Sequence, residues 1–137
     1  IALNFRGVAP RDSSTTGRLS YTTDLYSLAT GERVGTASHE FAAAVTRQAG
    51  IVDHLMRFRL PAGEIVSHDL MSVAPDPMHP GQIHVGIHPD KATIVPERGT
   101  GAYAGRTGRL RMAGWHGGTY PATETFDDFY VIELDPK

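Results

Sequence analysis

The sequence predicts an all-β protein: a single eight-stranded antiparallel β-barrel over residues 1–137, with an apolar lumen. Fifteen glycines and nine prolines are spread along the 137 residues and divide the chain into many short segments. Apolar and polar residues alternate in eight of these segments, which is the period of a half-buried strand. Turn-forming connectors such as Ala29-Thr30-Gly31-Glu32 and Pro61-Ala62-Gly63 join several of them as hairpins.

About eight strands close a barrel whose interior holds one small ligand. The segment Glu40–Gln48 is the best helical alternative to this all-β interpretation. Residues 74–81 contain three prolines and are predicted to form a stiff loop, and the segment 9–17 is polar. We expect these two loops to border the mouth of the barrel and to control access to it. The predicted strands cover residues 2–8, 18–28, 33–46, 51–61, 64–73, 82–96, 106–115 and 125–135.

Composition excludes several classes of partner. Thirteen basic residues stand against fifteen acidic ones, without basic blocks, so we expect no binding to nucleic acid or to an anionic membrane. No apolar run approaches the ~20 residues of a membrane helix. The absence of cysteine excludes disulfides, thiolate catalysis and cysteine-ligated zinc. No signal peptide is recognisable, and we expect a cytoplasmic protein.

Alternation also predicts which side chains face the lumen. The predicted lining is mostly apolar, and small residues at inward positions, such as Ala37, Ala43 and Gly114, would leave room for a hydrophobic small-molecule substrate. The alternative is that the same side chains fill the centre of a small barrel. The predicted substrate-binding residues are Tyr21, Leu25, Phe41, Met56, Phe58, Leu110 and Met112.

Two histidines, His39 and His54, fall among these inward positions and are the candidate catalytic residues. Each can donate a hydrogen bond to a substrate carbonyl or act as a general acid or base near neutral pH. The alternative is a neutral imidazole that is bonded to a backbone carbonyl or to water. Asp69, Asp127 and Asp128 are further ionisable candidates, and alternation allows only one of the last two to face inward.

Two other catalytic arrangements fit the sequence less well. Ser67, His68 and Asp69 are consecutive, so alternation sends His68 to the face opposite the other two and argues against a catalytic triad. Seven histidines suggest a metal, but no His-x-His pair with a following glutamate is present and no acidic residue has ligand spacing to them. A metal needs three or four converging donors. We therefore expect no metal site.

The stretch 99–114 is rich in glycine and surrounds one aromatic residue, Tyr103. A phosphate-binding loop must open a helix whose N-terminus meets the anion. This loop opens a strand instead, since Arg109 and Arg111 alternate with Leu110 and Met112. We therefore expect a tight turn with positive φ, followed by a bent strand at a barrel corner.

Several motifs resemble the allene oxide cyclase and dirigent barrel superfamily. One is Asp24-Leu25-Tyr26 followed by Gly31 and Val34-Gly35-Thr36, and another is Gly99-Thr100-Gly101-Ala102-Tyr103-Ala104-Gly105 followed by Gly108. With Pro61-Ala62-Gly63 between them, the resemblance covers residues 20–115. Within the superfamily the chain looks most like the bacterial spirotetronate cyclases, in Tyr21-Thr22-Thr23-Asp24-Leu25-Tyr26 and in Arg111-Met112-Ala113-Gly114.

The resemblance implies an allene oxide cyclase-like, calycin-like barrel that needs no cofactor and forms a homodimer or homotrimer. It implies a cyclase or isomerase of polyketide biosynthesis, which encloses a linear polyene and promotes an intramolecular cyclisation such as a [4+2] cycloaddition. Orientation of a flexible chain can supply ~7–11 kcal/mol in favourable cases. The cyclases carry larger aromatics where this chain has His54 and Leu110, so we expect a different substrate. A non-catalytic barrel for lipophilic ligands and a structural barrel with a filled core are the alternatives.

Overall fold

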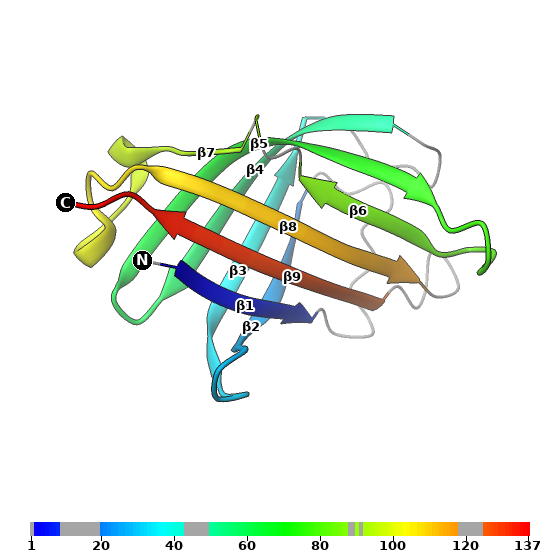
Figure 1. Cartoon of the computed structure of the whole chain (residues 1–137), viewed down its shortest axis with the longest axis horizontal. Helices are drawn as coiled ribbons and strands as arrows, with labels where there is room; N and C mark the ends of the chain where they lie inside the picture. The colour runs from blue at the N-terminus through cyan, green and yellow to red at the C-terminus, as the bar shows by residue number, and fades with distance from the viewer. Residues whose placement is uncertain (1, 9–19, 43–49, 88–89, 91, 118–124) are drawn as a thin grey trace.

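A computed structural model describes residues 2–8, 20–42, 50–87, 90, 92–117 and 125–137. It confirms the all-β prediction: eight antiparallel strands close into a barrel because β4 pairs with β5, and one further short strand, β7, lies outside the closed ring (Figure 1). The strands are β1 (Ala2–Val8), β2 (Ser20–Ser27), β3 (Arg33–Phe41), β4 (Gly50–Leu60), β5 (Gly63–Pro75), β6 (Ile83–Ile87), β7 (Thr93–Ile94), β8 (Gly108–Gly117) and β9 (Thr125–Leu134).

The ring order is β4-β3-β2-β1-β9-β8-β6-β5, so the N-terminal strand pairs with the C-terminal one. The prediction of one continuous strand over residues 82–96 is wrong, because β6 ends at Ile87 and only Thr93 and Ile94 continue as β7. Pro89 lies between them and has no backbone N–H to contribute to a ladder. β3 ends at Phe41, and the rest of the predicted strand 33–46 and of the helical alternative Glu40–Gln48 falls largely outside the described residues.

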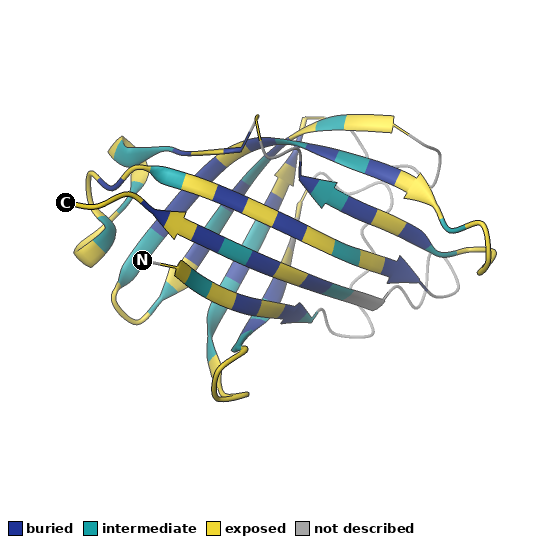
Figure 2. Ribbon diagram, viewed as in Figure 1, coloured by how far each residue is buried: buried dark blue, intermediate teal, exposed yellow. Residues whose placement is uncertain are grey.

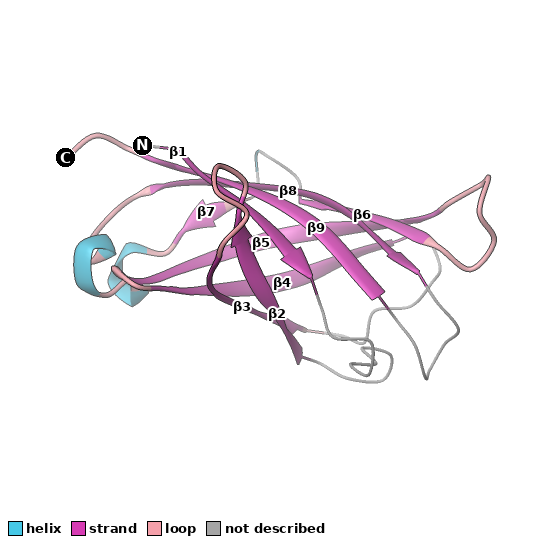
Figure 3. Ribbon diagram, turned by 90° about the horizontal axis from the view of Figure 1, so that it is seen from below, coloured by secondary structure: helices cyan, strands magenta, loops and turns pink. Residues whose placement is uncertain are grey.

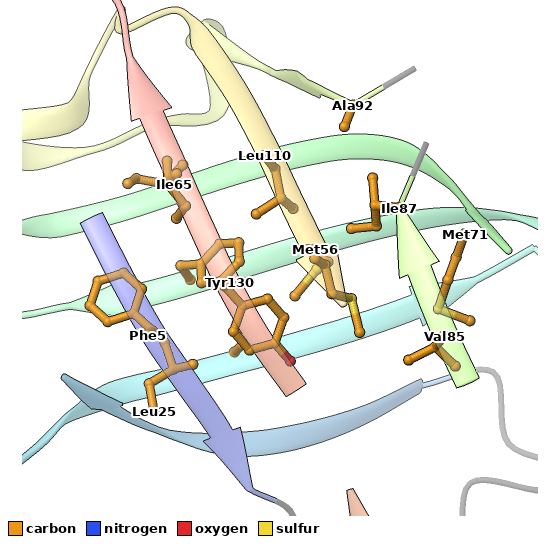
Figure 4. Close-up of a cluster of buried hydrophobic side chains, with 14 of the residues drawn as sticks. Phe5, Leu25, Met56, Ile65, Met71, Val85, Ile87, Ala92, Leu110 and Tyr130 are labelled. Atoms are coloured by element: carbon orange, nitrogen blue, oxygen red, sulfur yellow. The ribbon is translucent and has the colours of Figure 1, made fainter. Parts of the chain in front are cut away.

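Burial follows the alternation that the sequence predicts (Figure 2). Along β4, His54, Met56 and Phe58 are buried, while Asp53 and Arg59 are exposed. Figure 4 shows side chains from different strands converging on one centre, and Tyr130 lies among the apolar residues there. Burial of such side chains is the main stabilising contribution, about 25 cal/mol per Å² of apolar surface. Among the described residues no helix is long and apolar enough to cross a membrane.

The glycine-rich loop lies at one end of the barrel. It forms two short 3-10 turns, Pro96–Arg98 and Gly101–Tyr103, that pack on the turn between β4 and β5 (Figure 3). A Cβ at Gly63 would lie 2.1 Å from the carbonyl oxygen of Thr100, and φ at Gly101 is 58°. The loop therefore contains the predicted turn with positive φ and then opens β8, and glycine at position 63 permits a close backbone approach that was not predicted.

A carboxylate organises the turn between β5 and β6. Asp76 accepts hydrogen bonds from the backbone N–H groups of Met78 and His79 at 2.8 and 3.2 Å. Its second oxygen bonds the ring nitrogens of His79 and His84 at 3.0 and 3.1 Å. This segment lies within the predicted stiff loop 74–81, although β5 extends to Pro75. Its role in access remains a prediction.

We expect Asp76 to make the turn sensitive to acid. The backbone N–H of Met78, and then the side chain of His79, lower the pKa of Asp76 from 3.8 to about 2. A carboxyl with a depressed folded-state pKa stabilises the fold above its ordinary pKa, and this contribution is lost as the pH falls from about 4 towards 2. A carboxyl-carbon NMR titration should give a midpoint near 2. A midpoint at 3.8 would contradict the assignment, and Asp76→Asn should remove this part of the pH dependence.

Candidate acid–base site in the barrel interior

A chain of hydrogen-bonded polar side chains crosses the largely apolar interior. We call it the interior chain. Its members come from β3, β4, β5, β8 and β9, and all are buried. In bonding order they are Ser67, Asp69, His54, His39, Tyr130, Asp128 and His116.

The first half joins three adjacent strands. Phe41, His54 and Asp69 are opposite one another in the register of β3, β4 and β5, so their side chains share the inner face. His54 Nδ1 lies 2.7 Å from Asp69 Oδ1, and Ser67 Oγ donates to Asp69 Oδ2 at 3.0 Å. His54 Nε2 lies 3.1 Å from Nδ1 of His39. The carboxylate thereby fixes the orientation of the His54 ring, as in carboxylate–histidine pairs of enzymes.

The second half reaches the opposite wall. Tyr130 on β9 places its hydroxyl 3.0 Å from His39 Nε2. The same hydroxyl donates to Asp128 Oδ2 at 3.2 Å, and His116 Nε2 lies 3.1 Å from Asp128 Oδ1. Tyr130 and Asp128 are two residues apart on one strand and so face the same side. His39 and the Tyr130 phenol together therefore link the His54–Asp69 and His116–Asp128 pairs into one continuous chain.

Two glycines make room for this second half. Gly7 on β1 and Gly114 on β8 lie opposite Asp128 in the registers on either side of β9. A Cβ at Gly114 would lie 2.0 Å from Asp128 Oδ1, and one at Gly7 would lie 2.6 Å from the Tyr130 ring. Any larger residue at either position would displace the carboxylate or the phenol. The prediction that Gly114 leaves free space in the lumen is wrong, because Asp128 occupies that space.

Aromatic rings isolate the histidines from water. Phe41 stacks on the His54 ring with centroids 4.7 Å apart and an interplanar angle of 16°. Phe58 meets Tyr130 edge-on at 5.4 Å. Burial, and then the neighbouring His54 and His116, lower the pKa of His39 well below its ordinary value. His39 is therefore neutral near pH 7 and uses one ring nitrogen as a donor and the other as an acceptor.

One hydroxyl beside the interior chain lacks a partner. Thr23 Oγ1 on β2 is buried and is the one unsatisfied buried side-chain polar atom among the described residues. It lies 3.1 Å from the position that a Gly7 Cβ would take, and the Tyr130 hydroxyl lies 2.9 Å from the same position. A buried hydroxyl without a hydrogen-bond partner destabilises the fold by about 1–3 kcal/mol. A polar atom placed beside Thr23 Oγ1 would therefore gain a hydrogen bond.

The structure brings most of the predicted site residues together. His39 and His54 are both buried, as predicted, and their rings are also hydrogen-bonded to each other. Tyr21 is opposite His39 in register, but its side chain falls outside the described set. The remaining predicted substrate-binding residues are all buried in the core cluster: Leu25, Phe41, Met56, Phe58, Leu110 and Met112.

The three candidate aspartates lie on the faces that alternation predicts. Asp128 faces inward, whereas Asp127 pairs with Arg6 on the outer surface at 2.6 Å. Ser67 and Asp69 face inward together, and His68 points out to Asp53 at 2.5 Å, so these three consecutive residues form no triad. Within the described ranges, no three His, Asp or Glu side chains group as a metal site.

Sequence reasoning missed Tyr130 and His116 as members of the site. Tyr130 has the same parity as Asp128 on β9, so alternation alone could have placed both on the inner face. His116 lies one residue beyond the predicted strand 106–115, but β8 continues to Gly117 and His116 shares the inner face with Gly114. Neither signal shows that Tyr130 reaches across the barrel to a histidine of β3. Comparison with protein-family models, with curated proteins and with solved structures gives no match to this chain.

Proposed function

We propose that this protein is a cofactor-independent cyclase or isomerase of polyketide biosynthesis, which acts in the cytoplasm on a linear apolar polyene held in the barrel lumen. The observation that carries the proposal is the interior chain, in which five ionisable aspartate and histidine side chains are buried within an apolar core. The motif resemblance to spirotetronate cyclases supports the substrate class.

The stability of the fold does not explain why the interior chain contains buried ionisable groups. Buried charged groups lose their hydration, and well-packed apolar side chains at the same positions are often as stable or more stable. Clusters of buried ionisable groups that are bonded to one another are instead typical of sites where proton transfer occurs. The apolar side chains around the interior chain fit an apolar substrate. They also lower the local dielectric constant, which strengthens each hydrogen bond of the interior chain.

In the proposed mechanism the apolar lining holds the polyene in its reactive fold. Met56, Phe58, Leu110 and Met112 supply shape. His54 or His39 exchanges one hydrogen bond of the interior chain for a hydrogen bond to a carbonyl conjugated to the reacting alkene and so polarises it. A hydrogen bond to that oxygen lowers the energy of the electron-poor alkene. The unpaired Thr23 hydroxyl provides a further contact for a polar atom of the substrate.

The test uses a linear compound with a conjugated diene at one end and an α,β-unsaturated ketone at the other, joined by a saturated tether. Multiple turnovers to a cyclic isomer of identical mass, separated by chromatography and identified by mass spectrometry, are expected with the protein and not in its absence. A stoichiometric complex from which the linear compound is recovered unchanged would overturn the proposal in favour of a non-catalytic carrier.

We also propose that the barrel forms a homodimer or homotrimer. Phe129 on β9 and Trp115 on β8 are 45% and 37% exposed on the outer surface of adjacent strands. Exposed aromatic patches on small proteins mark contact surfaces. Light scattering at tens of micromolar should give a dimeric or trimeric mass, and Phe129→Glu should shift it to that of a monomer. A monomeric mass for the unaltered chain would contradict this prediction.

A further inference from the structure

The interior chain has a direction, which is set by the atom that donates in each hydrogen bond. The Tyr130 hydroxyl donates its single proton to Asp128 Oδ2. The 3.0 Å contact between Tyr130 and His39 Nε2 therefore has the ring nitrogen as its donor. Because His39 is neutral, its Nδ1 then carries no proton and accepts from Nε2 of His54 at 3.1 Å.

The direction of these hydrogen bonds also fixes the protonation of His54 and Asp69, at the other end of the interior chain. His54 Nε2 carries a proton, and a second proton lies in the 2.7 Å hydrogen bond between His54 Nδ1 and Asp69 Oδ1. The His54–Asp69 pair therefore has no net charge, while Asp128 carries a negative charge and accepts from both Tyr130 and His116. One end of the chain holds a proton, and the other end is able to receive it.

We propose that the interior chain is a proton relay, which moves one proton between the His54–Asp69 pair and the Asp128 carboxylate through His39 and Tyr130. The proton on His54 Nε2 passes to His39 Nδ1, the proton on His39 Nε2 passes to the Tyr130 oxygen, and the Tyr130 proton passes to Asp128 Oδ2. Three bonds to hydrogen break and three form. His54 loses one positive charge, Asp128 loses one negative charge, and every intermediate group ends with its original number of protons.

The relay deepens the proposed function, on which its use in catalysis rests, but its existence depends on no substrate. It gives a substrate in the lumen a proton donor at one wall and a proton acceptor at the other. It also assigns positioning roles to Tyr130 and Asp128, neither of which is among the predicted catalytic residues. The relay also requires Gly7 and Gly114, because the absence of side chains at these positions leaves the space that Tyr130 and Asp128 occupy.

The relay is tested by the tautomer of His39, read from the ¹⁵N shifts of its ring. Asp128→Asn keeps the shape of the side chain, and its amide NH₂ group takes the place of Oδ2 beside Tyr130. The amide then donates to the Tyr130 oxygen, Tyr130 donates to His39 Nε2, and His39 carries its proton on Nδ1. His54 gives up its Nε2 proton to solvent and accepts from His39 Nδ1. We expect Nε2–H in the unaltered protein and Nδ1–H in Asp128→Asn.

Asp53→Asn is the matched control, since it makes the same change in the exposed pair with His68. His39 should keep the Nε2–H tautomer in this control. A folded Asp128→Asn variant in which His39 also keeps Nε2–H would overturn the relay. Loss of turnover is not required for either outcome. A changed tautomer in a protein without cyclase activity would refute the proposed function and leave the relay in place.

A second measurement uses the unaltered protein, and it tests the relay even if Asp128→Asn fails to fold. A scalar coupling between His54 Nε2 and His39 Nδ1, detected through the hydrogen bond in the unaltered protein, is expected with the proton on His54. Absence of the coupling, or a proton resident on His39 Nδ1, would overturn the proposal.

Discussion

Asp69→Ala is expected to lower the free energy of unfolding by about 3–5 kcal/mol, because it breaks a buried ion pair by removing one partner. Asp69 accepts from both His54 and Ser67, and all three side chains are buried. Without the carboxylate, His54 Nδ1 and Ser67 Oγ lose their acceptor in a place that water does not reach. Urea denaturation followed by circular dichroism measures the loss.

The matched control is Asp53→Ala, which removes the carboxylate from an exposed His–Asp pair in the same two strands. Exposed pairs contribute about 0–1 kcal/mol, so this variant should unfold close to the midpoint of the unaltered protein. Equal losses in the two variants would contradict the placement of Asp69 in the interior chain.

Gly114→Ala is expected to destabilise the barrel by about 3 kcal/mol, at the upper end of the usual range for overpacking. The added Cβ would lie 2.0 Å from Asp128 Oδ1 and 2.7 Å from the backbone oxygen of Asp127. The backbone of a paired strand has little freedom to move, so the carboxylate must leave its place between Tyr130 and His116. Thermal unfolding measures the loss of stability, and the His116 ring ¹⁵N shifts should report the broken bond to Asp128.

Gly86→Ala is the control for this substitution. Gly86 lies on β6, a neighbour of β8, and its nearest atoms to an added Cβ are at 3.6 and 3.7 Å, which is ordinary contact. Alanine is about 0.5–1 kcal/mol better than glycine inside a strand, so this variant should be as stable as the unaltered protein or slightly more stable. A Gly114→Ala variant as stable as Gly86→Ala would contradict the close packing around Asp128.

The alternation of side chains made most of the fold predictable. Period-two patterns identified the inner faces of β3, β4 and β8, and the connectors at Gly31 and Gly63 identified two hairpins, where φ is 73° and 138°. The break between β6 and β7 was missed, because the alternation of residues 82–96 does not show that β6 ends at Ile87 and that β7 covers only Thr93–Ile94.

The candidate site was predictable only in part. Alternation states which face a residue occupies but not which residues on other strands lie next to it. His39 and His54 were therefore placed inside without the knowledge that they contact each other and Asp69. Tyr130 reaches His39 from 91 positions away in the chain, so no local pattern contains that contact. Gly7 and Gly114 have no side chain, and their role appears only when Tyr130 and Asp128 are in place beside them.

We expect the buried carboxylate–histidine pairs of the interior chain to take part in catalysis. The rate at which Asp69→Asn converts the tethered diene–enone, compared with the rate of Asp53→Asn and corrected in each case for the folded fraction, measures that contribution. We expect at least a tenfold lower kcat for Asp69→Asn, equivalent to ~1.4 kcal/mol of transition-state stabilisation, and no change for Asp53→Asn. Equal rates for the two folded variants would contradict this expectation.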